Sequence, residues 1–211
     1  NYSELFVFEK LLKQTQYITV VDPNKNLEQL SKELEKDYVL STSSNIVITN
    51  TINEEVIERL NWGKDVICLI DSTTKIPESF TYKINSREEE WLDGNWATNM
   101  NWLRDYNPLF KGISFSKTFG FEIAQTVSRR VITEIPSENF NDVLSGMFVG
   151  WLHRNSAYVL QMKAGKGKLI FCTFPLVENY SSDPFAKLFL QNLIDYVQST
   201  DFKPITNWKL D

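Results

Sequence analysis

The first seventy residues alternate strand-like and helix-like segments, and this alternation restricts the fold more than any other feature of the sequence. Short apolar runs rich in Val and Ile are typical of strands buried on both faces. Leucines at helical spacing behind an Asn cap are typical of the helices between them. This order of elements predicts an α/β domain with a mainly parallel sheet in three layers. The expected strands cover residues 5–8, 17–22, 46–49 and 65–71, and the expected helices follow the N-cap candidates Asn24 or Asn26, and Asn53.

The last third of the chain predicts an antiparallel hairpin followed by a final helix. Two strand-like runs, Ala157–Lys163 and Lys168–Phe174, flank Gly165-Lys-Gly167, and a glycine turn between such runs favours a hairpin. A phosphate-binding loop is the alternative, but that loop needs four residues between its glycines and a helix after them. Asp183 before Pro184 predicts a capped helix that begins at the proline.

The composition indicates a globular domain and argues against two classes of partner. The chain is 42% hydrophobic and 13% aromatic, which is too aromatic for a disordered segment, and it has no apolar run long enough to span a membrane. Its 22 Lys and Arg are scattered and are outnumbered by 27 Asp and Glu, so we expect no nucleic-acid partner and no membrane. No repeat or linker divides the chain. We therefore expect one domain over residues 1–211, cut from inside a longer polypeptide.

Residues that could carry chemistry are few. Cys68 and Cys172 lie inside strand-like runs and not on a strand-to-helix elbow, so we expect structural thiols rather than nucleophiles. His153 is the only histidine, and it cannot complete a zinc site of the usual kind with two cysteines. We therefore expect no metal, no cofactor and no catalytic residue. The cysteines do not decide the compartment, and a periplasmic or secreted location is favoured over a cytoplasmic one.

Residues 72–115 lose the regular alternation and read as a long excursion rich in Trp and Asn. Three tryptophans within twelve residues could form a platform for a sugar ring. The favoured alternative is that they bury against the sheet or a neighbouring domain, because Trp is highly buried on average and enriched at interfaces. A second group follows at the start of the hairpin. The candidate ligand or interface residues are Trp91, Trp96, Asn99, Trp102, Arg104, Trp151, His153 and Arg154.

The segment Trp151–Leu176 and the helix after Asp183 resemble the end of an accessory domain of glycoside hydrolases, especially the β-galactosidase-like enzymes of family 2. Asn107-Pro-Leu-Phe-Lys-Gly112 is similar to a stretch of that domain in which His is common at the first position. The resemblance implies a flavodoxin-type domain like the class I glutamine amidotransferases. Their cysteine elbow and their His-x-Glu are missing from this sequence, so it implies lost amidase chemistry. The glycosidase glutamates would lie on a TIM barrel outside this chain.

Three functions stay open at this point. The first is a non-catalytic accessory domain of a glycoside hydrolase, which supports the architecture or the substrate cleft and has the sandwich and TIM-barrel domains of the same polypeptide as partners. The second is an independent carbohydrate-binding module that takes an oligosaccharide. The third is a free-standing enzyme of amidotransferase or peptidase type.

Overall fold

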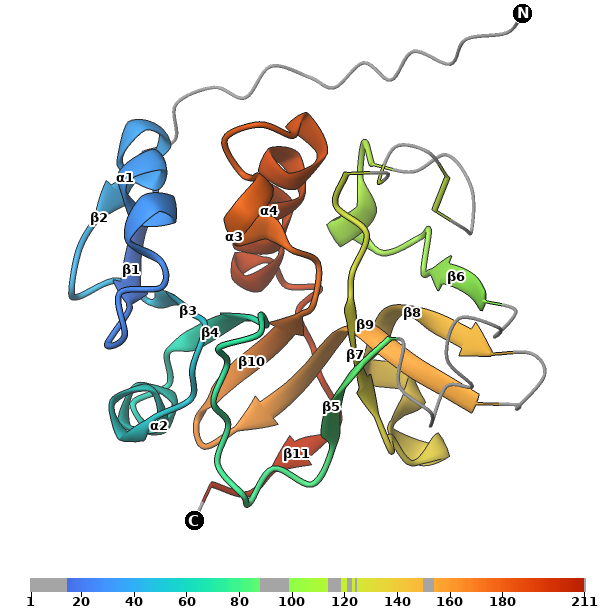
Figure 1. The fold of residues 1–211 in the computed structure, drawn as a ribbon. Coiled ribbons are helices and arrows are strands. Elements are labelled where there is room, and N and C mark those ends of the chain that lie inside the picture. Colours follow the sequence, from blue (N-terminus) through green and yellow to red (C-terminus); the bar gives the residue numbers. More distant parts are fainter. Residues whose placement is uncertain are drawn as a thin grey trace, which may run out of the picture.

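The computed structural model describes residues 15–87, 99–113, 119–120, 123, 125–149 and 154–210 (Figure 1). The strand expected at residues 5–8 lies outside them. Within the described part, one eleven-stranded mixed sheet runs through the molecule, with the main order β2-β1-β3-β4-β10-β9-β7-β5. No helix in these ranges is both long and apolar enough to cross a membrane.

The first half of the sheet is parallel, and it confirms the strand–helix alternation read from the sequence. Neighbouring strands here pair in the same direction from the outer edge inward. Across the sheet these strands are β2 (Val39–Leu40), β1 (Tyr17–Val21), β3 (Ile46–Thr49), β4 (Asp65–Leu69) and β10 (Gly167–Cys172).

The second half of the sheet is antiparallel and is larger than the sequence predicted. The long strand β9 pairs with β10, β7 and β8, and it also carries the short parallel strand β11. The strands of this half are β5 (Lys83–Ser86), β6 (Asn99–Leu103), β7 (Arg130–Thr133), β8 (Val143–Val149), β9 (Arg154–Ala164) and β11 (Asn207–Trp208).

The reading of residues 72–115 as an irregular excursion is wrong in part, because this segment contributes β5 and β6 to the sheet. β5 pairs with β7 and β6 pairs with β8, so both partners lie far along the chain. Neither strand has the continuous apolar run that marks a strand buried on both faces. Their pairing is decided by distant segments, which a local pattern does not record.

The helices pack their apolar stripes against two separate groups of core residues. Leu30 of α1 and Phe185 of α4 belong to one buried cluster, and Val56 of α2 belongs to the other. Figure 1 shows α1 and α4 on one side of the parallel strands and α2 on the other. Successive strand residues point to opposite faces, so Val47 and Ile48 of β3 join different clusters. The helices are α1 (Glu28–Asp37), α2 (Glu54–Asn61), α3 (Leu176–Asn179) and α4 (Pro184–Gln198), with 3-10 helices at Pro108–Phe110 and Ser137–Asp142.

The helix caps agree with the sequence at two helices and differ at one. The Asn53 side chain accepts a bond from Val56 N at 3.0 Å, and the Asp183 side chain accepts one from Phe185 N at 3.0 Å, as predicted. The predicted Asn cap of α1 is wrong. The carboxylate of Asp22, which follows β1, accepts the backbone N–H groups of Asn26 and Leu27 instead, at 2.8 Å each.

The glycine pair of the predicted hairpin is required by packing as well as by the turn. β9 and β10 pair antiparallel across Gly165 and Lys166, and Gly165 has a φ of +60°, which favours glycine. A Cβ added at Gly167 would lie 2.0 Å from the carbonyl oxygen of Lys64, just beyond α2. This confirms a hairpin turn packed against the end of α2 and leaves no helix after the glycines to cradle a phosphate.

Candidate binding site

A cavity of about 730 Å³ opens at the amino ends of the parallel strands. Pockets that hold small molecules usually measure about 300–1,000 Å³. Tyr17, Ile46 and Asp65 each open a strand, and Lys168 is the second residue of β10, so the parallel order brings their four segments to one edge. The cavity is lined by Gln16, Tyr17, Ser41, Ser43, Ser44, Asn45, Ile46, Asp65, Lys168, Val197 and Gln198.

The lining is mostly hydroxyl and amide groups, with one exposed aromatic ring. The serines precede β3, where the chain returns from the short edge strand β2. Ser44 is tied to the cavity wall, because its Oγ donates to the Tyr17 carbonyl at 2.5 Å. Ser41 and Ser43 keep their hydroxyls at the exposed side, 3.0 Å from each other. Tyr17, the aromatic residue of the lining, is 61% exposed.

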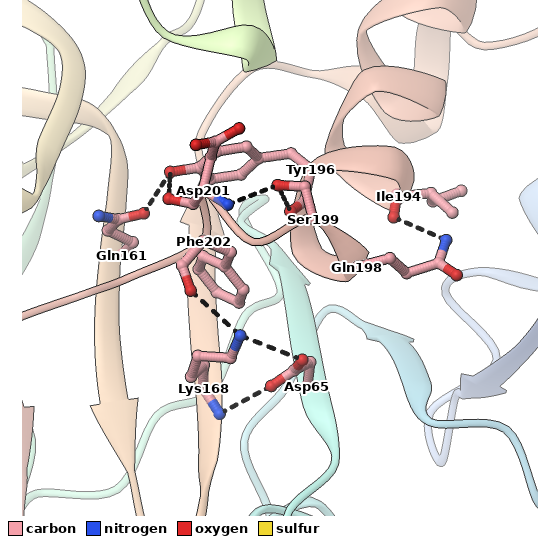
Figure 2. A network of polar contacts seen from close by, with 9 residues as sticks. All are labelled: Asp65, Gln161, Lys168, Ile194, Tyr196, Gln198, Ser199, Asp201 and Phe202. Carbon is pink, nitrogen blue, oxygen red and sulfur yellow. Dashed lines mark hydrogen bonds and ion pairs between the residues drawn. The ribbon is translucent and has the colours of Figure 1, made fainter.

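One ion pair, Asp65 with Lys168, supplies the only charged groups of the lining. Lys168 Nζ lies 3.6 Å from one Asp65 oxygen, and Lys168 N donates to the other at 3.1 Å. Nζ also donates to the Phe202 carbonyl at 3.1 Å, a bond drawn in Figure 2. The same Nζ lies 4.4 Å from the centre of the Phe202 ring. Burial raises the pKa of Asp65, and the charge and hydrogen bonds of Lys168 oppose this rise. The two charges therefore balance each other inside the protein.

A buried polar network behind the cavity fixes the segment that follows α4. Tyr196 OH donates to Gln161 Oε1 at 2.8 Å and lies 3.2 Å from the Asp201 carbonyl (Figure 2). Burial raises the pKa of Tyr196, so this hydroxyl stays protonated and can donate. Gln161 in turn donates to the buried carboxylate of Asp142 at 3.0 Å. Because Val197 directly follows Tyr196, the network also holds the cavity wall that α4 provides.

The carboxyl edge of the same strands, where ligands usually bind in open α/β sheets, is occupied by side chains that bind one another. Asn50 Nδ2 donates to Asp71 Oδ2 and to Thr73 Oγ1, at 3.1 Å each. Asn26 Nδ2 also donates to Thr73 Oγ1, at 2.8 Å. In the described ranges no group of three or more His, Cys, Asp and Glu could hold a metal ion. The 730 Å³ cavity lies at the opposite, amino edge of these strands.

The two thiols lie in the centre of the sheet. Cys68 and Cys172 are 0% exposed, on the neighbouring strands β4 and β10. Burial raises the pKa of Cys172 to about 12 and also raises the pKa of Cys68. Both groups are therefore protonated at neutral pH, and a protonated, buried thiol is a poor nucleophile.

The structure brings some of the predicted ligand or interface residues together. Asn99 opens β6 and Arg154 opens β9, and both pair with Val149 of β8, so the two backbones lie in one row across the sheet. Arg154 is half-buried and makes a contact of its own. Four of the predicted ligand or interface residues lie outside the described part of the chain: Trp91, Trp96, Trp151 and His153.

Trp102 and Arg104 are held by the protein itself. The half-buried Trp102 ring lies 6.3 Å from the Phe140 ring and packs against the core cluster of α2. Arg104 donates to the carbonyls of Val143 and Phe140 at 2.7 and 2.8 Å, and to Tyr106 OH at 2.9 Å. These contacts connect β6 to the beginning of β8.

The sequence reasoning missed the cavity residues, because they come from separate segments of the chain. One signal was available. Asp65 and Lys168 carry opposite charges at the starts of two strand-like runs, and parallel pairing of those runs places the charges side by side. The polar run Ser43-Ser-Asn45 directly before a strand points to the same edge.

The comparisons with known proteins give one family and several distant structures. A protein family described as "Domain of unknown function (DUF8487)" matches residues 47–211. No curated protein matches the sequence. Similar solved structures include the cold-adapted β-galactosidase from Rahnella sp. R3 (TM-score 0.45, 10% identity), the β-galactosidase from Bacillus circulans sp. alkalophilus (0.42, 12%) and a GH42 β-galactosidase from G. stearothermophilus (0.37, 13%).

These likenesses cover 90%, 90% and 91% of this chain, and 32%, 32% and 31% of those enzymes. The chain thus spans about a third of their length.

Proposed function

The chain belongs to the family described as Domain of unknown function (DUF8487), and from this premise we propose that it is a non-catalytic domain of a larger, β-galactosidase-like glycoside hydrolase. The observation that carries the non-catalytic part is the burial of both thiols in the sheet. An amidotransferase or thiol peptidase needs an accessible cysteine with a lowered pKa, and burial here raises both pKa values.

The glycosidase part of the proposal is supported by the sequence resemblance, and the structure assigns a packing role to one of its motifs. Asn107–Gly112 forms a capped 3-10 turn, in which Asn107 Oδ1 accepts Leu109 N at 2.9 Å. Asn192 of α4 donates to the carbonyls of Leu109 and Lys111, at 2.9 Å each. The motif therefore docks a loop onto the final helix and supports the architecture of the domain.

The same proposal includes the fold type and the parent enzyme. We propose that the chain is a flavodoxin-type, three-layer domain, related to class I glutamine amidotransferases and attached to a family 2 glycoside hydrolase. In the parent protein it would contact the sandwich and TIM-barrel domains and support the architecture or the substrate cleft.

The test combines activity with thiol accessibility. The purified 211-residue chain is assayed for hydrolysis of nitrophenyl β-galactoside and for release of ammonia from glutamine, and its thiols are titrated with Ellman's reagent. We expect no turnover, no reaction of either thiol in the native protein and reaction of both in urea. Turnover of either substrate would show that the domain is an enzyme, and loss of ammonia release in Cys68→Ala or Cys172→Ala would assign that reaction to a thiol.

A further inference from the structure

We propose that the cavity at the amino ends of the parallel strands is a binding site for a neutral, polyhydroxylated molecule, and that this ligand is a saccharide. The neutral, hydroxyl-rich chemistry is argued from the cavity alone. The choice of a saccharide among such molecules rests on the proposed function. The site is separate from the aromatic residues that the sequence suggested for sugar binding.

The charge of the lining favours a neutral ligand. Its acid and its base are paired with each other, and Lys168 Nζ has a further acceptor in the Phe202 carbonyl. Two charged neighbours of the lining have opposite signs and are bonded to it: Lys64 Nζ donates to Asn45 Oδ1 at 2.8 Å, and Asp195 accepts from Gln16 Nε2 at 3.0 Å. An anion such as a phosphate would have to compete with Asp65 for Lys168, and a cation would have to compete with Lys168 for Asp65. A ligand without charge can bind without breaking this pair.

The hydrogen-bonding groups of the cavity fit hydroxyls. A serine hydroxyl both donates and accepts, and an amide carries one group of each kind, so together they match ligand hydroxyls that do the same. Gln16 adds an acceptor that lacks a hydrogen-bond donor. Its Nε2 donates to Asp195 at 3.0 Å, whereas its buried Oε1 has no partner among the described residues. Buried acceptors are nearly always bonded. Because Oε1 is buried, a ligand hydroxyl bonds to it only after the Gln16 side chain turns toward the cavity, and Asn50 Oδ1 and Gln191 Oε1, which do not line the cavity, lack a partner in the same way.

The aromatic ring supplies the apolar contact that such a ligand also needs. One face of a pyranose carries mainly C–H groups, which pack on an aromatic face while the hydroxyls point outward to polar groups. Tyr17 lines the cavity and is an exposed residue, and β1 holds its backbone in the sheet between β2 and β3. The chain provides a matched control in Tyr106, which is 75% exposed and does not line the cavity.

The test is an NMR titration of the ¹⁵N-labelled 211-residue chain with galactose, lactose and glucose, carried to millimolar concentrations. We expect at least one of these sugars to shift amide signals of residues 16–17, 41–46 and 168 in a saturable way. Tyr17→Ala is expected to weaken binding about tenfold through loss of the stacked ring, whereas Tyr17→Phe and Tyr106→Ala should bind like the wild type.

Three outcomes would overturn the inference. One is the absence of saturable shifts with all three sugars in a chain whose spectrum is folded. The second is binding that Tyr17→Ala does not weaken, and the third is a set of shifts that maps away from the cavity. Hydrolysis of nitrophenyl β-galactoside is measured on the same sample. A chain that neither binds nor hydrolyses sugar loses only this inference, whereas a chain that hydrolyses the glycoside refutes the proposed non-catalytic function.

Discussion

The cap of the final helix gives a quantitative test of how this domain is held together. Asp183 is 7% exposed, and its carboxylate has two partners. Oδ1 accepts Phe185 N at 3.0 Å, and Oδ2 accepts the hydroxyl of the fully buried Thr126, which lies 57 residues earlier in the chain. The cap therefore begins α4 and also connects a distant segment to it.

Replacing Asp183 with Ala removes both contacts. Loss of the cap costs about 1 kcal/mol, and a buried hydroxyl left without a partner costs about 1–3 kcal/mol. We therefore expect Asp183→Ala to lower the free energy of unfolding by about 2–4 kcal/mol. Asn53→Ala is the matched control, because Asn53 caps α2 through one bond, to Val56 N, and should cost about 1 kcal/mol.

Equilibrium unfolding in urea, followed by tryptophan fluorescence, measures these differences. A double-mutant cycle with Thr126→Val isolates the bond between the two side chains, and we expect a coupling energy of about 1–2 kcal/mol. The reasoning would be refuted if Asp183→Ala cost no more than Asn53→Ala. A coupling energy indistinguishable from zero would likewise show that Thr126 adds nothing to the cap.

Two further predictions concern the hairpin and the ion pair. Gly167→Ala should destabilise the fold by about 1–3 kcal/mol in urea unfolding, because the new methyl group meets the Lys64 carbonyl, whereas Lys166→Ala at the neighbouring exposed turn position should stay within about 0.5 kcal/mol of the wild type. Lys168→Met removes the cation that opposes the raised pKa of Asp65. An acid whose pKa is higher in the folded state binds more protons there, so the free energy of unfolding falls as pH rises between the unfolded and the folded pKa. Lys168→Met should thus lower the free energy of unfolding, relative to the wild type, more at about pH 7 than at about pH 4. Equal decreases at the two pH values would show that Lys168 does not oppose the raised pKa of Asp65.

The sequence by itself determined the elements whose signals are local. The structure contains the predicted strands β1, β3 and β4 and the predicted helix α1. It also contains the Asn53 cap, the glycine turn and the helix that begins at Pro184 after Asp183. Each of these depends on neighbours a few residues away, through helical or strand periodicity or through a single cap. Local physical chemistry is sufficient for such features, and it predicted β1, β3 and β4 of the parallel half, but neither the short strand β2 nor the parallel pairing of β10 with β4.

Only the tertiary structure decided the antiparallel half and the cavity. β6 is a strand because β8 offers it a partner edge more than forty residues away, and nothing in Asn99–Leu103 alone requires this. The cavity joins Gln16, Ser43, Asp65 and Lys168 from four separate segments. Its shape and its balanced charge arise from the order of parallel strands, which is a property of the assembled sheet and not of any one segment.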